Sequence, residues 1–296
     1  MGVEAPKIQI PEQRPKADAE LADAFTSAQH AVYKLTAGPH FRDLCHKRGV
    51  DPDNDMGEMP YWDTVEEFSS AFVEKNRSLS GNSLRLSTFE LLAATPAYIF
   101  HETALTNGSL KTANAVRQSK EMASYYNSLL RVFATEFPDS SVATSEGALL
   151  GMTNMALESK EARQHAAWLI HSSIRGAQHE LAFGQILAHT GRDFSPTSLD
   201  EDLNGADYTV DGSRTGILQI DVKASLDKIE QKGETKLPYT VSSDGKITMY
   251  SMVKDSEFHD KFFIPEAVAA QKAPAVDRLL TEAEHAHAIG KLIYSS

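Results

Sequence analysis

From Ala19 onward, apolar residues recur at the spacing of three and four residues that is typical of amphipathic helices. The spacing is clear over residues 19–34, and it dominates again from Thr64 to His189. It is interrupted where Gly, Pro, Ser and Asn gather, near residues 78–82, 106–109 and 138–144. Its longest stretches are residues 110–137 and 159–189. The pattern therefore predicts a helical N-terminal region.

After Gly191 the pattern changes to short runs of β-branched residues separated by turn residues. These runs predict strands at residues 207–210, 217–222, 239–241, 247–253 and 262–265. Two short helices, Glu266–Gln271 and Val276–Ile293, are expected to close the chain. The order of elements predicts an α+β fold, with a flexible arm over residues 1–17, a helical region over 18–155 and an α+β unit over 156–296.

The composition of the chain excludes several kinds of site and several classes of protein. The 296 residues carry 29 Lys and Arg against 41 Asp and Glu, a net charge of -12, which argues against non-specific coating of nucleic acid. The single cysteine, Cys45, excludes an intramolecular disulfide, a multi-cysteine zinc site and an iron–sulfur cluster. The apolar stretch Leu91–Phe100 has about half of the ~20 residues that a membrane-spanning helix needs. Since no signal-peptide pattern is present either, we expect a cytoplasmic protein without a membrane partner.

Several common catalytic motifs do not occur. Neither Gly-Lys pair is preceded by the glycine that a P-loop requires, and no G-x-G-x-x-G or G-x-S-x-G segment is present. His101-Glu102 and His179-Glu180 begin like the helix of a zinc protease, but Leu105 and Phe183 stand where the second histidine is needed. The chemistry must therefore be sought elsewhere.

One predicted strand, Ile217–Lys223, carries its charges on a single face. Side chains alternate along a strand, so one face is expected to be apolar and the other polar. The apolar face holds Leu218, Ile220 and Val222, and the polar face holds Gln219, Asp221 and Lys223. A carboxylate and an ammonium group on a largely buried strand cost desolvation free energy unless a metal or substrate uses them. A salt-bridged edge strand would also explain the pair.

A second acidic residue, Asp207, begins the preceding predicted strand. Between the two strands, Asp211-Gly212-Ser213 is a hairpin-turn signal. Antiparallel pairing of these strands would bring Asp207 and Asp221 close together. Two carboxylates with one lysine form a hard-oxygen site of the kind that suits Mg²⁺ or Mn²⁺.

A third acidic residue, Glu180, lies on the predicted helix before the hairpin. Gly176 and Gly184 stand four residues before and after it, and their lack of side chains would let the helix backbone approach the element that it covers. From the inner edge of this helix Glu180 could reach the same metal site. A partly exposed helix glutamate is the alternative interpretation.

The order Glu180, Asp207 and Asp221-Val222-Lys223 resembles the PD-(D/E)XK nuclease superfamily, which includes restriction endonucleases and archaeal Holliday-junction resolvases. The segment from Arg175-Gly176 to Glu180 is similar to the first helix of the resolvase-like members. The resemblance covers residues 163–225, about a fifth of the chain, and the proline usual before the first Asp is Ala206 here. It implies a restriction-endonuclease-like α/β core with a small mixed sheet flanked by helices.

The resemblance also implies a role for each residue. Asp207 and Asp221, with the carbonyl of Val222, would hold Mg²⁺ or Mn²⁺, which would activate a water and neutralise charge on the leaving oxygen. Lys223 would orient or deprotonate that water or hold the phosphate. Glu180 would complete the metal shell or position a water, and Gln219 would contact substrate.

The expected function is that of a metal-dependent nuclease, a DNA endonuclease of restriction or repair type. One alternative is a catalytically inactive scaffold of the same fold in a nucleoprotein or virion assembly. Another is an unrelated helical interaction protein whose three carboxylates lie far apart. The five lysines between residues 223 and 246 are nearly cancelled by four acids. A DNA-binding surface would thus need lysines gathered by folding, an added partner or a homodimer with a shared groove.

Overall fold

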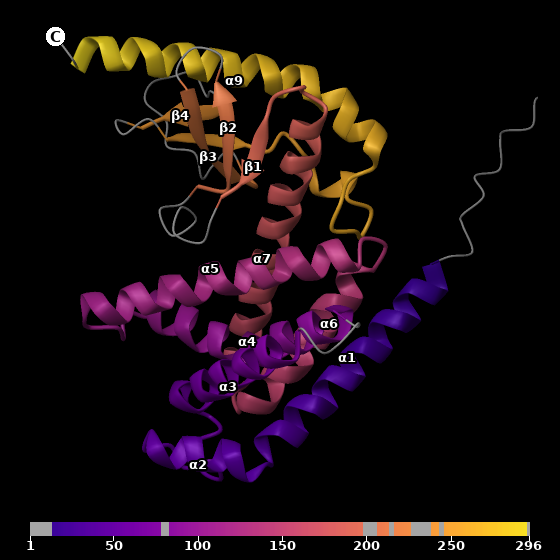
Figure 1. Ribbon diagram of the computed structural model, residues 1–296, viewed down its shortest axis with the longest axis vertical. Helices are drawn as coiled ribbons and strands as arrows, with labels where there is room; N and C mark the ends of the chain where they lie inside the picture. Colours follow the sequence, from indigo (N-terminus) through magenta and orange to yellow (C-terminus); the bar gives the residue numbers. More distant parts are fainter. Residues whose placement is uncertain are drawn as a thin grey trace, which may run out of the picture.

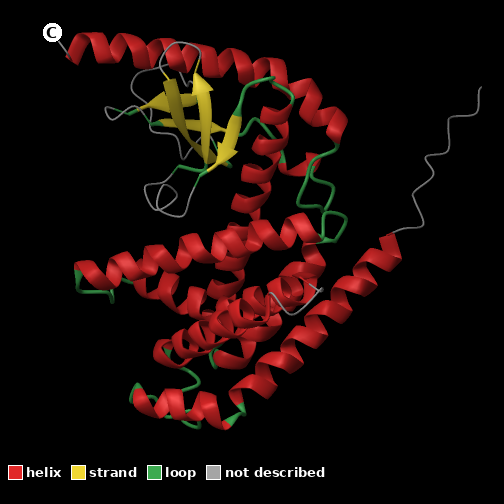
Figure 2. Cartoon of the chain, viewed as in Figure 1, coloured by secondary structure: helices red, strands yellow, loops and turns green. Residues whose placement is uncertain are grey.

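The computed structural model describes residues 14–77, 83–197, 206–212, 216–225, 238–242 and 246–294. Its helices are α1 (Arg14–Thr36), α2 (Pro39–Lys47), α3 (Met59–Arg77), α4 (Ser83–Thr106), α5 (Ala113–Glu136), α6 (Val142–Ala156), α7 (Lys160–Ala188) and α9 (Glu266–Tyr294), with a short 3₁₀ turn, η2 (Asp255–Glu257). Its strands are β1 (Phe194–Pro196), β2 (Tyr208–Gly212), β3 (Gly216–Lys223), β4 (Tyr239–Val241) and β5 (Ile247–Tyr250). The α+β fold is confirmed, and Figure 2 shows the strands gathered at one end of the molecule.

The helical region follows the predicted pattern closely. Thr112, Ser141 and Ser159 each accept a hydrogen bond from a backbone N–H of the first turn, and so cap α5, α6 and α7. The expected interruptions near residues 106–109 and 138–144 separate α4, α5 and α6, while residues 78–82 lie outside the described residues. Helix α1 begins at Arg14, inside the expected arm of residues 1–17, and helix α2 was not predicted.

The five strands form one mixed sheet in the order β1-β2-β3-β5-β4. Strands β3 and β5 pair in parallel, and the other neighbours are antiparallel. Strands β2 to β5 match predicted runs, but β1 was missed and the predicted strand 262–265 does not form. The apolar residues of that segment serve two cores instead, because Phe262 packs with the helical region and Ile264 packs with the sheet.

The two short helices expected at the C-terminus are one continuous helix, α9. Pro274 lies inside it and lacks the N–H that would bond to the carbonyl of Ala270. Both residues are exposed, so water can satisfy that carbonyl, whereas Ala273 and Val276 are buried against the sheet. Burial of the inner face keeps the helix intact through the proline.

Helix α7 belongs to both hydrophobic cores. Its first half, including Ile170 and Ile174, packs among the N-terminal helices, and its second half, including Phe183 and Ile186, packs beneath the sheet. Figure 1 shows α7 running from the helical region to the sheet, and α9 packs with its second half in the same core, against the apolar face of the sheet. The division between the two hydrophobic cores therefore falls within α7. The expected domain boundary, at residue 155, lies before this helix. No helix in the described ranges is both long and apolar enough to cross a membrane.

Gly184 is the point at which α7 comes closest to the sheet. A Cβ atom added there would lie 2.5 Å from the hydroxyl oxygen of Tyr208, whose O–H donates to the carbonyl of Glu180 over 2.9 Å. The close approach expected of the helix glycines is thus present at Gly184. It is absent at Gly176, where nothing lies within 4 Å of an added Cβ.

The substitution Gly184→Ala is therefore expected to lower the free energy of unfolding by about 1–3 kcal/mol, since Tyr208 is buried and cannot easily move aside. The matched control Gly176→Ala should raise it by about 0.5–1 kcal/mol through better helix propensity. Urea unfolding followed by circular dichroism measures both values. Equal effects at the two glycines would contradict the tight contact.

Candidate functional site

Strands β2 and β3 bring Asp207 and Asp221 near each other. Their register ends at Tyr208 with Ile220, and the N–H of Asp207 donates to the carbonyl of the same Ile220 over 2.7 Å, so Asp207 lies one position off the register. It is nevertheless close enough to Asp221 for the two charges to interact. The Asp207 side chain is fixed as well, because its Oδ2 atom accepts a hydrogen bond of 2.6 Å from the N–H of Val222. The hairpin pattern predicts this juxtaposition, although residues 213–215 at the turn itself lie outside the described residues.

The carboxyl group of Asp207 is held where negative charge is costly. The residue is 7% exposed, and burial is the main cause that raises its pKa from 3.8 to about 6. The hydrogen bond from Val222 opposes this rise, the nearby charge of Asp221 adds to it, and the charges of Arg131 and Lys223 oppose it. A cation beside Asp207 would therefore bind to a group whose charge is poorly solvated.

Asp221 and Lys223 lie on one face of β3, as strand alternation predicts. The ammonium Nζ of Lys223 donates to Oδ1 of Asp221 over 2.5 Å. On the parallel neighbour β5, Thr248 pairs with Asp221 and its hydroxyl lies 3.4 Å from Oδ2. Gln219 lies on the same strand at an exposed position opposite Thr209. The other face of β3 is apolar and packs in the core of the sheet.

Glu180 approaches this hairpin from α7, but its carboxylate has a different partner from the one expected. Its Oε2 atom lies 3.5 Å from Nη1 of Arg131, and both side chains are largely buried. Arg131 belongs to α5 in the helical region, and its charge also acts on Asp207 and Tyr208. Sequence reasoning missed Arg131, because no motif links α5 to a hairpin so much later in the chain.

The acidic residues near the hairpin are the possible ligands of the implied metal ion. Among the residues that the structure describes, no three His, Cys, Asp or Glu side chains form a group able to hold a metal. Mg²⁺, however, is commonly held by one or two carboxylates, with waters and substrate phosphates as its other ligands. Asp207 and Asp221 supply two such carboxylates, and burial raises the pKa of Asp207 because the protein alone solvates its negative charge poorly. The pair therefore fits a hard divalent cation, with Glu180 outside the first set of ligands.

A second polar network surrounds His179, one residue before Glu180. Its Nδ1 atom lies 2.6 Å from the hydroxyl of Ser251, and its Nε2 atom lies 3.0 Å from Oδ1 of Asp255, which also accepts from Arg175. Burial is the main cause that lowers the pKa of His179. Hydrogen bonds link Ser251, His179 and Asp255 in series, as in a catalytic triad. Ser251 is fully buried, however, and no substrate can reach its hydroxyl. The network anchors the segment after β5 to α7.

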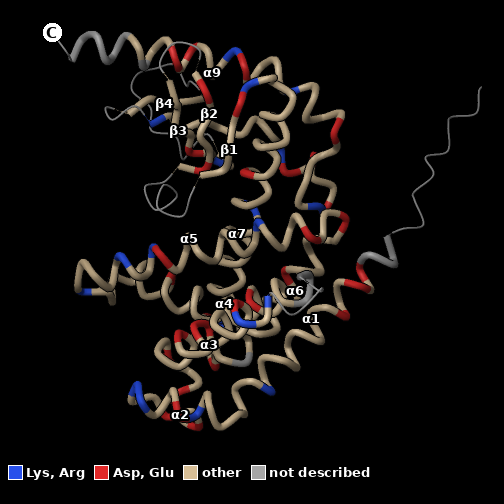
Figure 3. The backbone as a smooth tube through the Cα atoms, in the orientation of Figure 1, with Lys and Arg blue, Asp and Glu red and all other residues tan. Residues whose placement is uncertain are grey.

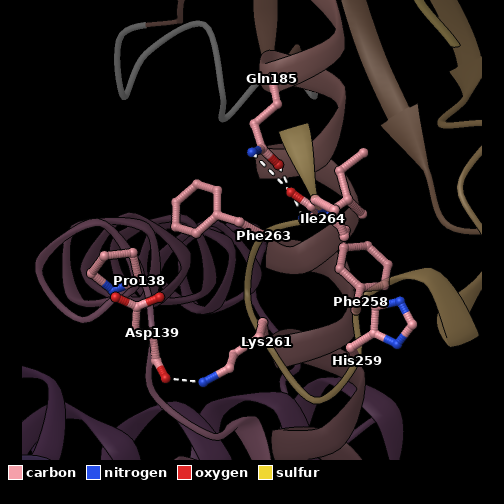
Figure 4. Close-up of a pocket in the computed structure, with 9 residues that line it drawn as sticks. Pro138, Asp139, Gln185, Phe258, His259, Lys261, Phe263 and Ile264 are labelled. Carbon is pink, nitrogen blue, oxygen red and sulfur yellow. Dashed lines mark hydrogen bonds between the residues drawn. The ribbon is translucent and has the colours of Figure 1, made fainter. Parts of the chain in front are cut away.

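A cavity of about 440 Å³ lies between the segment after α5 and the loop before α9 (Figure 4). Its polar groups are occupied by the protein itself. The Gln185 side chain bonds to both the N–H and the carbonyl of Ile264, at 3.1 and 3.2 Å, and Lys261 donates to the carbonyl of Asp139. Much of the remaining lining is apolar, including Phe258 and Phe263. The cavity offers no set of reactive groups comparable to the hairpin.

Lys and Arg positions are scattered among Asp and Glu over the fold, including along α5 (Figure 3). Three of the lysines expected to supply a DNA-binding surface, Lys228, Lys232 and Lys236, lie outside the described residues. Comparisons of the chain with known protein families, curated proteins and solved structures found no match. The functional proposal therefore depends on the geometry of the site and on the order of its residues.

Proposed function

We propose that the protein is a divalent-metal-dependent nuclease that hydrolyses phosphodiester bonds of DNA, as an endonuclease of restriction or repair type. The observation that supports this function is the buried Asp207 close to Asp221, which shares a strand face with Lys223 and accepts a hydrogen bond from it. The order of these residues resembles the PD-(D/E)XK superfamily, and the fold has the mixed sheet that the resemblance implies.

In this proposal Asp207 and Asp221, with the carbonyl of Val222, hold Mg²⁺ or Mn²⁺. A bound cation would supply Lewis-acid polarisation of the phosphate and an acidified water. Lys223, whose side chain is one-third exposed, can exchange its contact with Asp221 for a phosphate oxygen or a water. Glu180 holds the guanidinium of Arg131 next to the site, and exposed Gln219 can contact substrate along β3.

Purified protein should nick or linearise a supercoiled plasmid in the presence of Mg²⁺ or Mn²⁺, and EDTA should abolish the reaction. A closed circle has no ends, so its cleavage also separates endonuclease from exonuclease activity, and a parallel assay on single-stranded and double-stranded RNA tests the choice of DNA. Intact plasmid and intact RNA with both metals would contradict the proposal.

The alternative is an inactive scaffold of the same fold in a nucleoprotein or virion assembly. It is favoured by the two ion pairs, Lys223 with Asp221 and Arg131 with Glu180, which neutralise acidic groups without a metal. Thermal unfolding with Mn²⁺ separates the two functions. A nuclease should be stabilised by Mn²⁺ in a way that Asp221→Asn removes, whereas a scaffold should show no such dependence.

The proposal also includes a cellular setting. We place the nuclease in the cytoplasm, where its single, buried Cys45 stays a thiol. A homodimer would bring two such sites to one duplex, as cutting both strands at once requires. Linear rather than nicked plasmid as the first product would support that arrangement.

A further inference from the structure

Helix α5 has two chemically distinct faces. One face is buried against the helical region through Tyr126, Leu130 and Phe133. The other carries Arg117, Lys120, Ser124 and Arg131, at successive steps of three, four and seven residues, which place all four side chains on one side of a helix. The two faces point in nearly opposite directions, so the polar face is turned away from the helical core.

This polar face leads to the candidate site. At its C-terminal end Arg131 contacts Glu180 and acts on Asp207, whereas Arg117 and Lys120 are exposed nearer its N-terminus. Figure 1 shows α5 running between the sheet and the other N-terminal helices. Arg117 to Arg131 spans about 21 Å of helix at 1.5 Å per residue, which corresponds to roughly six 3.4 Å steps of a DNA strand.

We propose that this face of α5 is the surface that holds the DNA backbone, with Arg117 and Lys120 on phosphates beside the cleavage point and Arg131 next to the scissile phosphate. The inference rests on the proposed nuclease function and names where its substrate lies. Arginine presents a fork of donors that matches a phosphate, and lysine adds a point charge. Two acids contact this face among the described residues. Glu180 pairs with Arg131 at its end next to the site, and Glu121 pairs with Arg117 at 3.6 Å across exposed side chains, a contact weak enough for a phosphate to replace.

The test uses the full chain and a fluorescently labelled 20-base-pair duplex, in EDTA so that metal-dependent cleavage is prevented. Fluorescence anisotropy gives Kd over a series of salt concentrations. The double variant Arg117→Gln with Lys120→Gln should raise Kd about tenfold and reduce the salt slope of log K by about 1.8, since each phosphate contact contributes about 0.9. Arg131→Gln should weaken binding in the same direction.

The matched control is Lys34→Gln with Lys47→Gln, which removes the same charge from exposed positions on α1 and α2. Its Kd should change less than twofold. Equal Kd values for the α5 and control variants, or no binding by the wild-type protein at low salt, would overturn the inference. Plasmid cleavage is measured separately with Mg²⁺, so a protein that cuts DNA without using α5 refutes the inference and leaves the nuclease function in place.

Discussion

Asp207→Asn, Asp221→Asn and Lys223→Gln should each lower the rate of Mg²⁺-dependent DNA cleavage by about 10³-fold or more. The asparagines keep the shape of the side chains and remove a charge proposed to bind the metal, and the glutamine removes the cation proposed to face the phosphate. A metal ion contributes several kcal/mol to the stabilisation of a phosphoryl transition state, and each ~1.4 kcal/mol corresponds to a factor of ten in rate. Initial rates of plasmid cleavage at saturating Mg²⁺ measure the effect.

Asp211→Asn is the matched control for these variants. Asp211 lies on β2 as well, but it is exposed and its N–H bonds to the carbonyl of Asp193, away from the candidate site. Its substitution should leave the rate within twofold of the wild type. If all three site variants cut at the wild-type rate while their circular dichroism spectra stay unchanged, the hairpin is not the active site.

The stability of the metal-free protein should depend on pH through Asp207. The pKa of Asp207 is about 6 in the folded chain, whereas the unfolded chain has the ordinary value of 3.8. Between these two pH values the folded state therefore keeps a proton that the unfolded state has lost. The free energy of unfolding is therefore reduced as the pH rises from about 4 to 6, by up to about 3 kcal/mol, and above that range the contribution is constant.

Asp207→Asn removes this group and should abolish its share of the pH dependence. In EDTA the variant should gain stability relative to the wild type between pH 4 and pH 7, since the asparagine oxygen can still accept from Val222. Urea unfolding at several pH values gives the difference, and Asp211→Asn again serves as the control. Parallel curves for wild type and Asp207→Asn would show that burial does not raise the pKa of this carboxyl group.

The local parts of this structure could be predicted from sequence. Alternation along residues 217–223 and the turn residues after Val210 indicate a hairpin, and the hairpin brings Asp207 near Asp221. Contacts between distant segments could not be predicted in this way. The pairing of Arg131 with Glu180 depends on how α5 packs against α7, and neither helix carries a local signal for it.

The predictions that were wrong also failed because of contacts between distant segments. Phe262 and Ile264 alternate like strand residues, yet they alternate because the segment passes between two cores. Pro274 is a helix breaker by local rules, and burial of the neighbouring face of α9 overrides it. Gly176 and Gly184 are equivalent in sequence, and only the position of Tyr208 distinguishes them.

Helix α7 is 29 residues long and continuous, and it is embedded at one end among helices and at the other beneath the sheet. Because the helix is continuous, it provides no hinge about which the helical region and the sheet could rotate relative to each other. The separation between α5 and the hairpin is thus set when the chain folds. A ligand that contacts both α5 and the hairpin would therefore meet side chains whose relative positions are already fixed in the folded protein, with no rotation of one region over the other.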